Sequence, residues 1–185
     1  MENFSRLQDL IDYKILSDRK VFMWSMVDDN SAKHVIDRLM YLDMVDPGKE
    51  IQMIINSPGG YVTAGMAIHD TMKSISSPVS TICTGLAASM GSILLSAGEK
   101  GRRFCMPYGR VMIHQPSGGA QGTATDIEIQ VHEMRKTKEI GARILAENCG
   151  HSLEKVMDDF NRDYWMDAEE SVGYGIVDAV LTEMK

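Results

Sequence analysis

Ser89 is the residue in this sequence whose surroundings best suit a nucleophile. It lies between a run of strand-forming residues that ends near Thr84 and a helical pattern that begins at the serine itself. Glycine and alanine residues on both sides leave its hydroxyl oxygen approachable, and a helix N-terminus favours negative charge that develops close by. A serine at such a junction can equally serve only as the N-cap of the helix, so both interpretations stay open for Ser89 alone.

A serine hydroxyl group needs a general base, and His114 is the histidine placed to supply one. It ends the apolar strand-like run Val111–His114 and precedes a loop rich in proline and glycine. Functional residues gather at the carboxyl ends of parallel strands, which predicts that His114 and Ser89 lie on the same edge of a sheet. The alternative is a histidine that merely closes a strand. We expect the other four histidines to be surface, boundary or turn residues: His34, His69, His132 and His151.

A carboxylate that orients the imidazole ring would complete such a site. The segment from Asp158 to Asp167 contains several acidic residues, and their spacing does not choose among them. The residues alone therefore predict a serine and a histidine and leave the third group open.

A glycine turn offers a further feature with chemical potential. Asn56–Gly60 follows the strand-like run Ile51–Ile55 and precedes a helical pattern. Two consecutive glycines allow backbone conformations that other residues avoid, and they can point N–H groups at an anionic atom. The alternative is a turn that only connects two elements. Neither a P-loop nor a G-x-G-x-x-G pattern is present, which argues against phosphate binding.

Strand-like and helical segments alternate along the chain, which predicts an α/β fold with mostly parallel strands. No repeat or linker divides the sequence, so we expect one domain of residues 1–185. The expected strands are Val21–Trp24, Ile51–Asn56, Val79–Thr84, Val111–His114 and Ile176–Leu181. The expected helices begin at Asn30 or Ser31, at Thr63, at Ser89 and at a capping box of Asp167 with Glu170 that Gly173 and Gly175 end.

The segment Ala124–Cys149 forms a helical pattern of 26 residues, or about 39 Å if it is continuous. This is longer than a domain of this size needs. A solvated surface helix is one interpretation. The other is a protruding helix that buries Ile127, Val131 and Met134 against another subunit, and the length favours this second interpretation.

The composition argues against several classes of function. A net charge of −7 and a pI near 5.2 do not fit nucleic-acid binding, which usually needs a basic face. Cys83, Cys105 and Cys149 match neither a disulfide framework nor a metal-ligand spacing, so we expect a cytoplasmic protein without a metal. Met1–Ile11 contains charged residues rather than the apolar run of a signal peptide. Ser74–Gly98 is uncharged but too polar and interrupted for a membrane helix.

Four segments resemble, in the right order, the family of Clp protease proteolytic subunits (ClpP). They are INSPGG (55–60), STICTGLAASMGS (80–92), KGRRFCMPYGRVMIHQP (100–116) and GTATDIEI (122–129). The resemblance extends over about Lys20 to Thr182. It implies a crotonase-like ββα spiral with a head domain, an N-terminal segment at 1–19 and a projecting handle at about 118–149.

The resemblance also implies a role for each residue of the site. Ser89 matches the nucleophile, His114 the base and Asp163 the orienting acid. Gly60 and Met90 match the residues whose N–H groups form the oxyanion hole. The positions that match the peptide-binding walls are Gly59, Tyr61, Val62, Pro116, Ser117 and Gly118.

The implied activity is that of a serine endopeptidase that hydrolyses unfolded proteins inside a closed chamber. Two heptameric rings would stack through their handles into a tetradecamer. An AAA+ unfoldase of the ClpX, ClpA or ClpC type would feed the substrates and use the ATP, so the chain itself needs no cofactor. No nucleic acid or membrane partner is implied.

Two other functions are weighed beside the peptidase. One is a mainly structural ClpP-like subunit that is inactive until it assembles with a paralogue, an idea prompted by the unfamiliar pattern of Met1–Asp12 and by Trp24–Met26 in place of a usual glycine turn. The other is a CoA-thioester hydratase or isomerase on the same spiral fold, which needs carboxylates as catalysts. The presence of Ser89, His114 and Asp163 together favours the peptidase.

Overall fold

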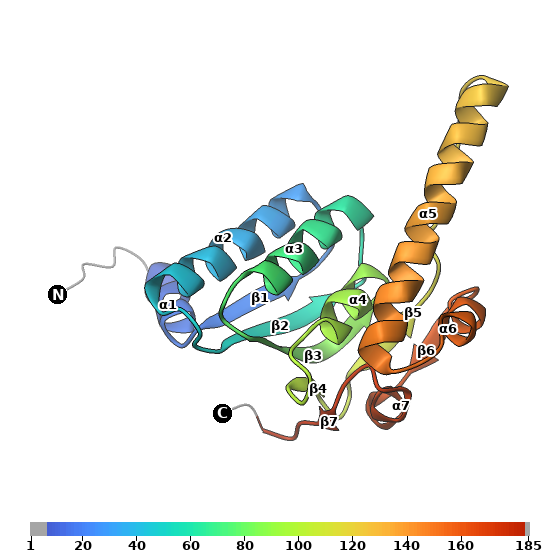
Figure 1. Cartoon of the computed structure of the whole chain (residues 1–185). Coiled ribbons are helices and arrows are strands. Elements are labelled where there is room, and N and C mark those ends of the chain that lie inside the picture. Colours follow the sequence, from blue (N-terminus) through green and yellow to red (C-terminus); the bar gives the residue numbers. More distant parts are fainter. Residues whose placement is uncertain (1–6, 184–185) are drawn as a thin grey trace.

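A seven-stranded sheet runs through the centre of the molecule (Figure 1). The computed structural model describes residues 7–183. The strands follow the order β1-β2-β3-β4-β7, while β5 pairs with β3 and β6 pairs with β5. Only β5 and β6 run antiparallel among the described strands, in agreement with the mostly parallel sheet that the sequence predicts. The strands are β1 (Lys20–Trp24), β2 (Ile51–Ser57), β3 (Val79–Ala88), β4 (Arg103–Cys105), β5 (Arg110–Ile113), β6 (Tyr164–Met166) and β7 (Ala179–Val180).

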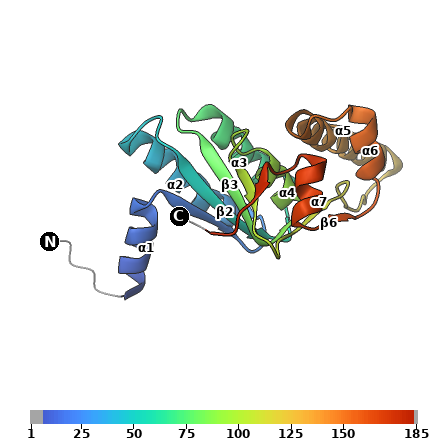
Figure 2. The same ribbon diagram turned by 90° about the horizontal axis from the view of Figure 1, so that it is seen from below.

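Helices cover the sheet and extend beyond it. The helices α2 and α3 lie side by side over β1, β2 and β3, whereas α5 projects away from the rest of the molecule (Figure 1). Figure 2 shows α1 at one end of the molecule and α6 and α7 at the other. The helices are α1 (Leu7–Ser17), α2 (Asp29–Val45), α3 (Val62–Ser74), α4 (Met90–Ser96), α5 (Ala124–Cys149), α6 (Leu153–Asp159) and α7 (Ala168–Tyr174). No helix within residues 7–183 is long and apolar enough to cross a membrane.

The strand β3 is longer than the sequence predicts and changes its partner along its length. Its first half lies between β2 and β4, and Leu86–Ala88 pairs with β5 instead. The apolar pattern predicts an end near Thr84, just before Gly85, which has a φ of 78° in the structure. The pairing with β2 is irregular in this region, yet the strand continues and delivers the chain to Ser89.

The cap of α2 is Asp28, not Asn30 or Ser31 as the sequence predicts. The Asp28 carboxylate accepts a hydrogen bond from the Ser31 N–H, and the Ser31 hydroxyl group accepts one from the Asp28 N–H. Ser31 is therefore the third residue of a capping box rather than its first. The apolar residues predicted for the inner face of the helix are buried: Val35, Leu39 and Leu42.

The capping box predicted for α7 is confirmed, with Asp167 and Glu170 bonded to each other's backbone N–H groups. The helix ends at Gly175, which has a φ of 83° in the left-handed region. Gly173 lies inside the helix, so the prediction that it ends the helix is wrong.

The last strand is shorter than the predicted segment 176–181, because β7 comprises only Ala179–Val180. The N–H groups of Ile176 and Val177 donate to the Ser171 carbonyl and close the end of α7 instead. The sequence does not predict α1, β4, α6 and β6. Three of these are too short to show a periodic pattern, and every residue of α1 is at least partly exposed.

The turn after β1 contains Ser25 where the resemblance implies a glycine. Ser25 adopts a φ of 77°, in the region that favours glycine, and its N–H donates to the Asn56 carbonyl at 2.9 Å. A serine therefore forms the turn that glycine would usually form.

Within the predicted segment 1–19, residues 7–17 form α1, and residues 1–6 lie outside the described part of the chain.

The long helix has the predicted bounds. Thr123 and Asp126 form a capping box at its start, and Gly150 ends it with a φ of 74°. The C-terminal part packs on the body through buried residues such as Ala142 and Leu145, while its N-terminal part is largely exposed. The helix therefore projects from the body at one end (Figure 1), while burial of Ile127, Val131 and Met134 against another subunit stays a prediction.

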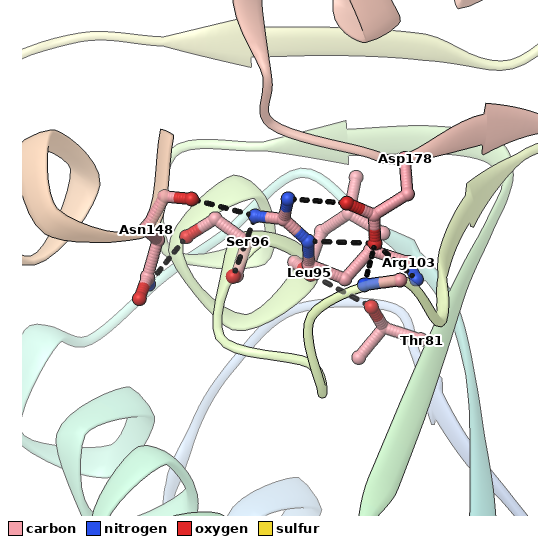
Figure 3. Close-up of polar contacts among 7 residues, drawn as sticks. Thr81, Leu95, Ser96, Arg103, Asn148 and Asp178 are labelled. Atoms are coloured by element: carbon pink, nitrogen blue, oxygen red, sulfur yellow. Dashed lines mark hydrogen bonds and ion pairs between the residues drawn. The ribbon is translucent and has the colours of Figure 1, made fainter. Parts of the chain in front are cut away.

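An ion pair between a buried arginine and a partly buried aspartate joins the base of α5 to the edge of the sheet (Figure 3). The Arg103 guanidinium donates to both carboxylate oxygens of Asp178, at 3.0 and 2.6 Å, and to the Asn148 carbonyl at 2.8 Å. The Asn148 side chain in turn donates to the Ser96 hydroxyl group at 3.1 Å. This network connects the ends of α4 and α5 with β4 and the residue that precedes β7.

Candidate active site

Ser89 lies at a sharp turn between β3 and α4. Its φ of 54° and ψ of −123° are strained for a residue other than glycine, and its N–H donates to the Met112 carbonyl at 2.9 Å. Within the described chain its hydroxyl group makes no hydrogen bond that caps α4, so the structure does not support the capping interpretation. Instead, Ser89 Oγ lies 2.9 Å from His114 Nε2.

His114 follows β5 directly, and this strand lies beside the last residues of β3. The pairing of Ala88 with Met112 places the residues after both strands at one edge of the sheet. This confirms the prediction that Ser89 and His114 share that edge. The imidazole is partly buried, with 25% of the side chain exposed, so solvent reaches the ring.

Asp163 comes to the other side of the imidazole, with its Oδ1 at 3.0 Å from His114 Nδ1. The reason is the antiparallel pairing of β5 and β6, which sets Ile113 opposite Tyr164 and so brings the residue before β6 next to the residue after β5. A backbone hydrogen bond also joins these two segments, since the Gln115 N–H donates to the Phe160 carbonyl at 2.6 Å. The carboxylate is 60% exposed, so water screens its field at the imidazole.

The glycine turn packs against the serine. A Cβ atom on Gly59 would lie 2.6 Å from Ser89 Cβ, and one on Gly60 would lie 2.2 Å from the Val27 carbonyl oxygen. Both glycines also have positive φ values, 89° and 153°. The turn therefore requires glycine at both positions for close approach, and it is more than a connection between two elements.

Met90 is the first residue of α4, and the N–H groups in the first turn of a helix have no intrahelical partner. Its N atom would lie only 2.9 Å from a Cβ built on Gly59, so the start of α4 and the glycine turn are in direct contact. The position of Met90 immediately after Ser89 leaves its N–H beside the serine.

A narrow pocket opens next to Ser89 and His114. Its cavity volume is small, about 20 Å³, and it is partly open to solvent. Its walls come from α3, α4, α5, the residue that follows α6 and the loop after β5. They are Val62, Met66, Met90, Ile93, Pro116, Thr137, Gly141 and Phe160. The lining is largely apolar.

The structure thus brings most of the predicted site residues together. Ser89, His114 and Asp163 form one hydrogen-bonded series, and Val62 and Pro116 line the adjoining pocket. Three other predicted peptide-binding residues are exposed, namely Tyr61, Ser117 and Gly118, whereas Gly59 is buried against Ser89.

Sequence reasoning missed the pocket residues contributed by distant elements: Met66, Ile93, Thr137, Gly141 and Phe160. No spacing signal could have identified them, because they meet only through the packing of α3, α4 and α5. Among residues 7–183, no group of three or more histidine, cysteine, aspartate or glutamate side chains converges as a metal site would require.

An α/β sheet that presents a serine, a histidine and an aspartate in this geometry fits the class of serine peptidases. A sequence profile described as Clp protease matches residues 3–184. The chain belongs to the Clp protease family, and it is a serine peptidase with the ββα spiral fold that the resemblance implies. The resemblance in the sequence motifs begins at about Lys20, whereas the profile match already begins at residue 3.

Two relatives from Bacteroides fragilis illustrate the similarity. Both bear the name ATP-dependent Clp protease proteolytic subunit, one in strain ATCC 25285 and one in strain YCH46. Each is 54% identical over 168 residues, which is 91% of this chain. The shared segment covers 81% of the first relative and 76% of the second.

Proposed function

We propose that this chain is the proteolytic subunit of an ATP-dependent Clp protease and hydrolyses peptide bonds of unfolded proteins. In this proposal Ser89 is the nucleophile, His114 the general base and Asp163 the orienting acid. The observation that carries it is the continuous series from Asp163 through His114 to Ser89, with separations of 3.0 and 2.9 Å. Membership in the Clp protease family supports the same activity.

The proton moves along this series during the reaction. His114 Nε2 takes the proton of the Ser89 hydroxyl group as Oγ attacks the scissile carbonyl carbon. Asp163 accepts a hydrogen bond from His114 Nδ1–H and so keeps the other ring nitrogen free to act as the base. The imidazolium then protonates the leaving amine, and a water molecule repeats the sequence on the acyl-enzyme.

The oxyanion of the tetrahedral intermediate is stabilised by the N–H groups of Gly60 and Met90. One donor of this kind is typically worth about 10²–10³ in kcat. The contact between Gly59 and Ser89 supports the assignment, because it fixes the glycine turn beside the start of α4.

The substrate is an extended peptide held between the backbone of Gly59–Val62 and that of 116–118. An extended segment can pair with such walls through backbone hydrogen bonds, while a side-chain pocket supplies selectivity. Val62 and Pro116 line the pocket beside Ser89, which joins the two proposed walls to the nucleophile.

The active assembly is a tetradecamer of two heptameric rings in the cytoplasm, with the handle at about 118–149 between the rings. Apolar side chains exposed on α5 support contact between subunits; they are Ile127, Ile129, Val131 and Ile140. An AAA+ unfoldase of the ClpX, ClpA or ClpC type supplies unfolded chains and uses the ATP. Both relatives carry ATP dependence in their names.

The pocket composition argues against a CoA-thioester hydratase or isomerase. Such an enzyme needs carboxylates as catalysts, whereas the described residues that line the pocket are apolar apart from Ser89, His114 and Thr137. A mainly structural subunit would have no need to retain the complete series of Ser89, His114 and Asp163.

Replacement of the nucleophile tests the proposal. We expect Ser89→Ala to abolish hydrolysis of a fluorogenic peptide while leaving the size of the assembly unchanged. Ser74→Ala, at an exposed serine at the end of α3, is the matched control and should keep the parental rate. Turnover retained in Ser89→Ala would contradict the mechanism.

A further inference from the structure

Tyr174, the last residue of α7, is a buried tyrosine that contacts the chain on both sides of Asp163. Its hydroxyl group donates a hydrogen bond to Asp159 Oδ2 at 2.9 Å. Its ring lies against the ring of Tyr164, with 5.6 Å between the two centroids. Asp159 ends α6 and Tyr164 begins β6, so one side chain contacts both ends of the short segment 160–163 that carries the proposed acid.

Gln115 holds the first half of the segment 160–163. Its backbone N–H donates to the Phe160 carbonyl, and its side chain donates to the Asn161 carbonyl at 2.8 Å. Phe160 is buried, whereas the other three residues of the segment are exposed. The Tyr174 ring adds a contact to the residue that follows the segment, and so restrains the second half.

Neighbouring side chains fix Tyr174 in this position. The His151 ring lies 4.6 Å from the Tyr174 ring, measured between centroids, and the Lys155 ammonium group lies 4.9 Å from the Tyr174 centroid. Lys155 Nζ also donates to Asp159 Oδ2 at 2.6 Å. Burial, and after it the hydrogen bond to Asp159, raises the pKa of Tyr174, so the hydroxyl group stays protonated and can donate.

We propose that Tyr174 is a positioning residue that acts through Asp163. By holding both ends of the segment 160–163, it keeps the Asp163 carboxylate within reach of His114 Nδ1, at 3.0 Å. The carboxylate is 60% exposed, so burial does not fix its position and the backbone that carries it must do so. This inference rests on the proposed function, because the orientation of His114 matters only if it is the base for Ser89.

A double-mutant cycle between Tyr174→Phe and Asp163→Ala tests the proposal. Tyr174→Phe removes the hydroxyl group and keeps the ring, whereas Asp163→Ala removes the group that is positioned. Each full-length variant is treated with a fluorophosphonate, and intact mass gives the rate of adduct formation. In this reaction Ser89 Oγ bonds to phosphorus, fluoride leaves, and His114 takes the serine proton.

We expect Tyr174→Phe alone to lower the labelling rate by about 10-fold, since a misplacement of about 1 Å can cost about 10²-fold. In the Asp163→Ala background the same substitution should change the rate by no more than about 2-fold, because the carboxylate is already absent. A merely structural role, or an effect through the pocket wall Phe160, would lower the rate by the same factor in both backgrounds. Equal factors, or an unchanged rate in Tyr174→Phe, would overturn the inference.

Two substitutions of Asp159 separate its hydrogen bond with Tyr174 from its ion pair with Lys155. Asp159→Asn keeps an oxygen that can accept the hydrogen bond, so the labelling rate should stay within about 2-fold of the parental rate. Asp159→Leu keeps no acceptor and should reproduce the loss seen in Tyr174→Phe, again without a further effect in Asp163→Ala. An equal loss in both Asp159 variants would assign the restraint to Lys155 and overturn the role of Tyr174.

Tyr108→Phe is the matched control, because it removes the same hydroxyl group from a tyrosine that is 94% exposed. It should keep the parental labelling rate. A parent chain that is not labelled at Ser89 would overturn the proposed function and this inference with it. A parent chain that is labelled, with Tyr174→Phe labelled equally fast, would overturn only the role of Tyr174.

Discussion

At the scale of single residues, the site depends on backbone conformations that cost free energy. The φ and ψ angles of Ser89 carry a cost on the order of 1–3 kcal/mol. The Met112 carbonyl and the contact with Gly59 hold the serine in this conformation. The strain is useful because it turns Oγ away from the α4 backbone and towards His114 Nε2, at 2.9 Å.

The orienting role of Asp163 can be tested by Asp163→Asn. The amide no longer fixes the imidazole in the tautomer that leaves Nε2 free, so we expect kcat for a fluorogenic peptide to fall by about 10³–10⁴-fold. The matched control is Asp158→Asn, at an exposed acidic residue of the same segment. An equal loss in both variants would show that Asp163 has no special role.

At the scale of elements, three strands assemble the site. Parallel pairing of β3 with β5 brings together Ser89 and His114, and antiparallel pairing of β5 with β6 adds Asp163. The sequence predicts that the residues after the first two strands share one edge of the sheet, because apolar runs reveal both strands. It does not predict the pairing of β5 with β6, since β6 has only three residues and the segment before it contains several carboxylates. Spacing along the chain therefore leaves the acid open, and only the resemblance to a family assigns it.

In the rest of the fold, too, local sequence patterns predict local features but not features that depend on contacts between elements. The bounds of α5 follow from its 26-residue pattern and its caps, which are local signals. The continuation of β3 past Gly85 and the short strand β7 depend on contacts between elements, and no local pattern contains that information.

The ion pair between Arg103 and Asp178 gives a prediction at this scale. Asp178→Asn leaves a buried guanidinium without its carboxylate, so we expect the free energy of unfolding to fall by about 3–5 kcal/mol. Glu50→Gln removes the carboxylate of the exposed pair with Arg102 and should cost less than about 1 kcal/mol. Chemical denaturation of both variants measures the difference, and equal losses would contradict the account.

The contribution of Asp178 should also depend on pH. Burial raises its pKa, but the hydrogen bonds and positive charge of Arg103 outweigh this effect and hold the pKa below the ordinary value of 3.8. A carboxyl group with a lowered pKa in the folded state stabilises the protein above its ordinary pKa, and this contribution is lost as the pH falls through the lower value. The stability difference between the parent and Asp178→Asn should therefore shrink below about pH 4. A difference that stays constant down to pH 2 would contradict this assignment.

At the scale of the whole molecule, α5 separates two tasks. Its C-terminal part packs on the body and contributes Gly141 and Thr137 to the pocket, while its N-terminal part projects into solvent (Figure 1). A single helix therefore connects the proposed contact between rings with the wall of the proposed active site. Arg103 and Asn148 anchor the base of this helix to the body (Figure 3).

A charge on the projecting part tests the proposed stacking of rings. The Ile129 side chain is 59% exposed, and burial of a glutamate in its place would cost far more than burial of an isoleucine. We expect Ile129→Glu to halve the mass of the assembly, as measured by size exclusion with light scattering. Ser74→Glu adds the same charge outside α5 and should keep the parental mass. An unchanged mass for Ile129→Glu would place the contact elsewhere.

The central claim, that Ser89, His114 and Asp163 form an assembled catalytic centre, is tested most directly by labelling with a fluorophosphonate. The reagent reacts with an activated serine, and intact mass followed by peptide mapping locates the adduct. The account predicts a single adduct at Ser89 in the full-length chain and none in Ser89→Ala. An unlabelled parent chain, or an adduct at another serine, would contradict it.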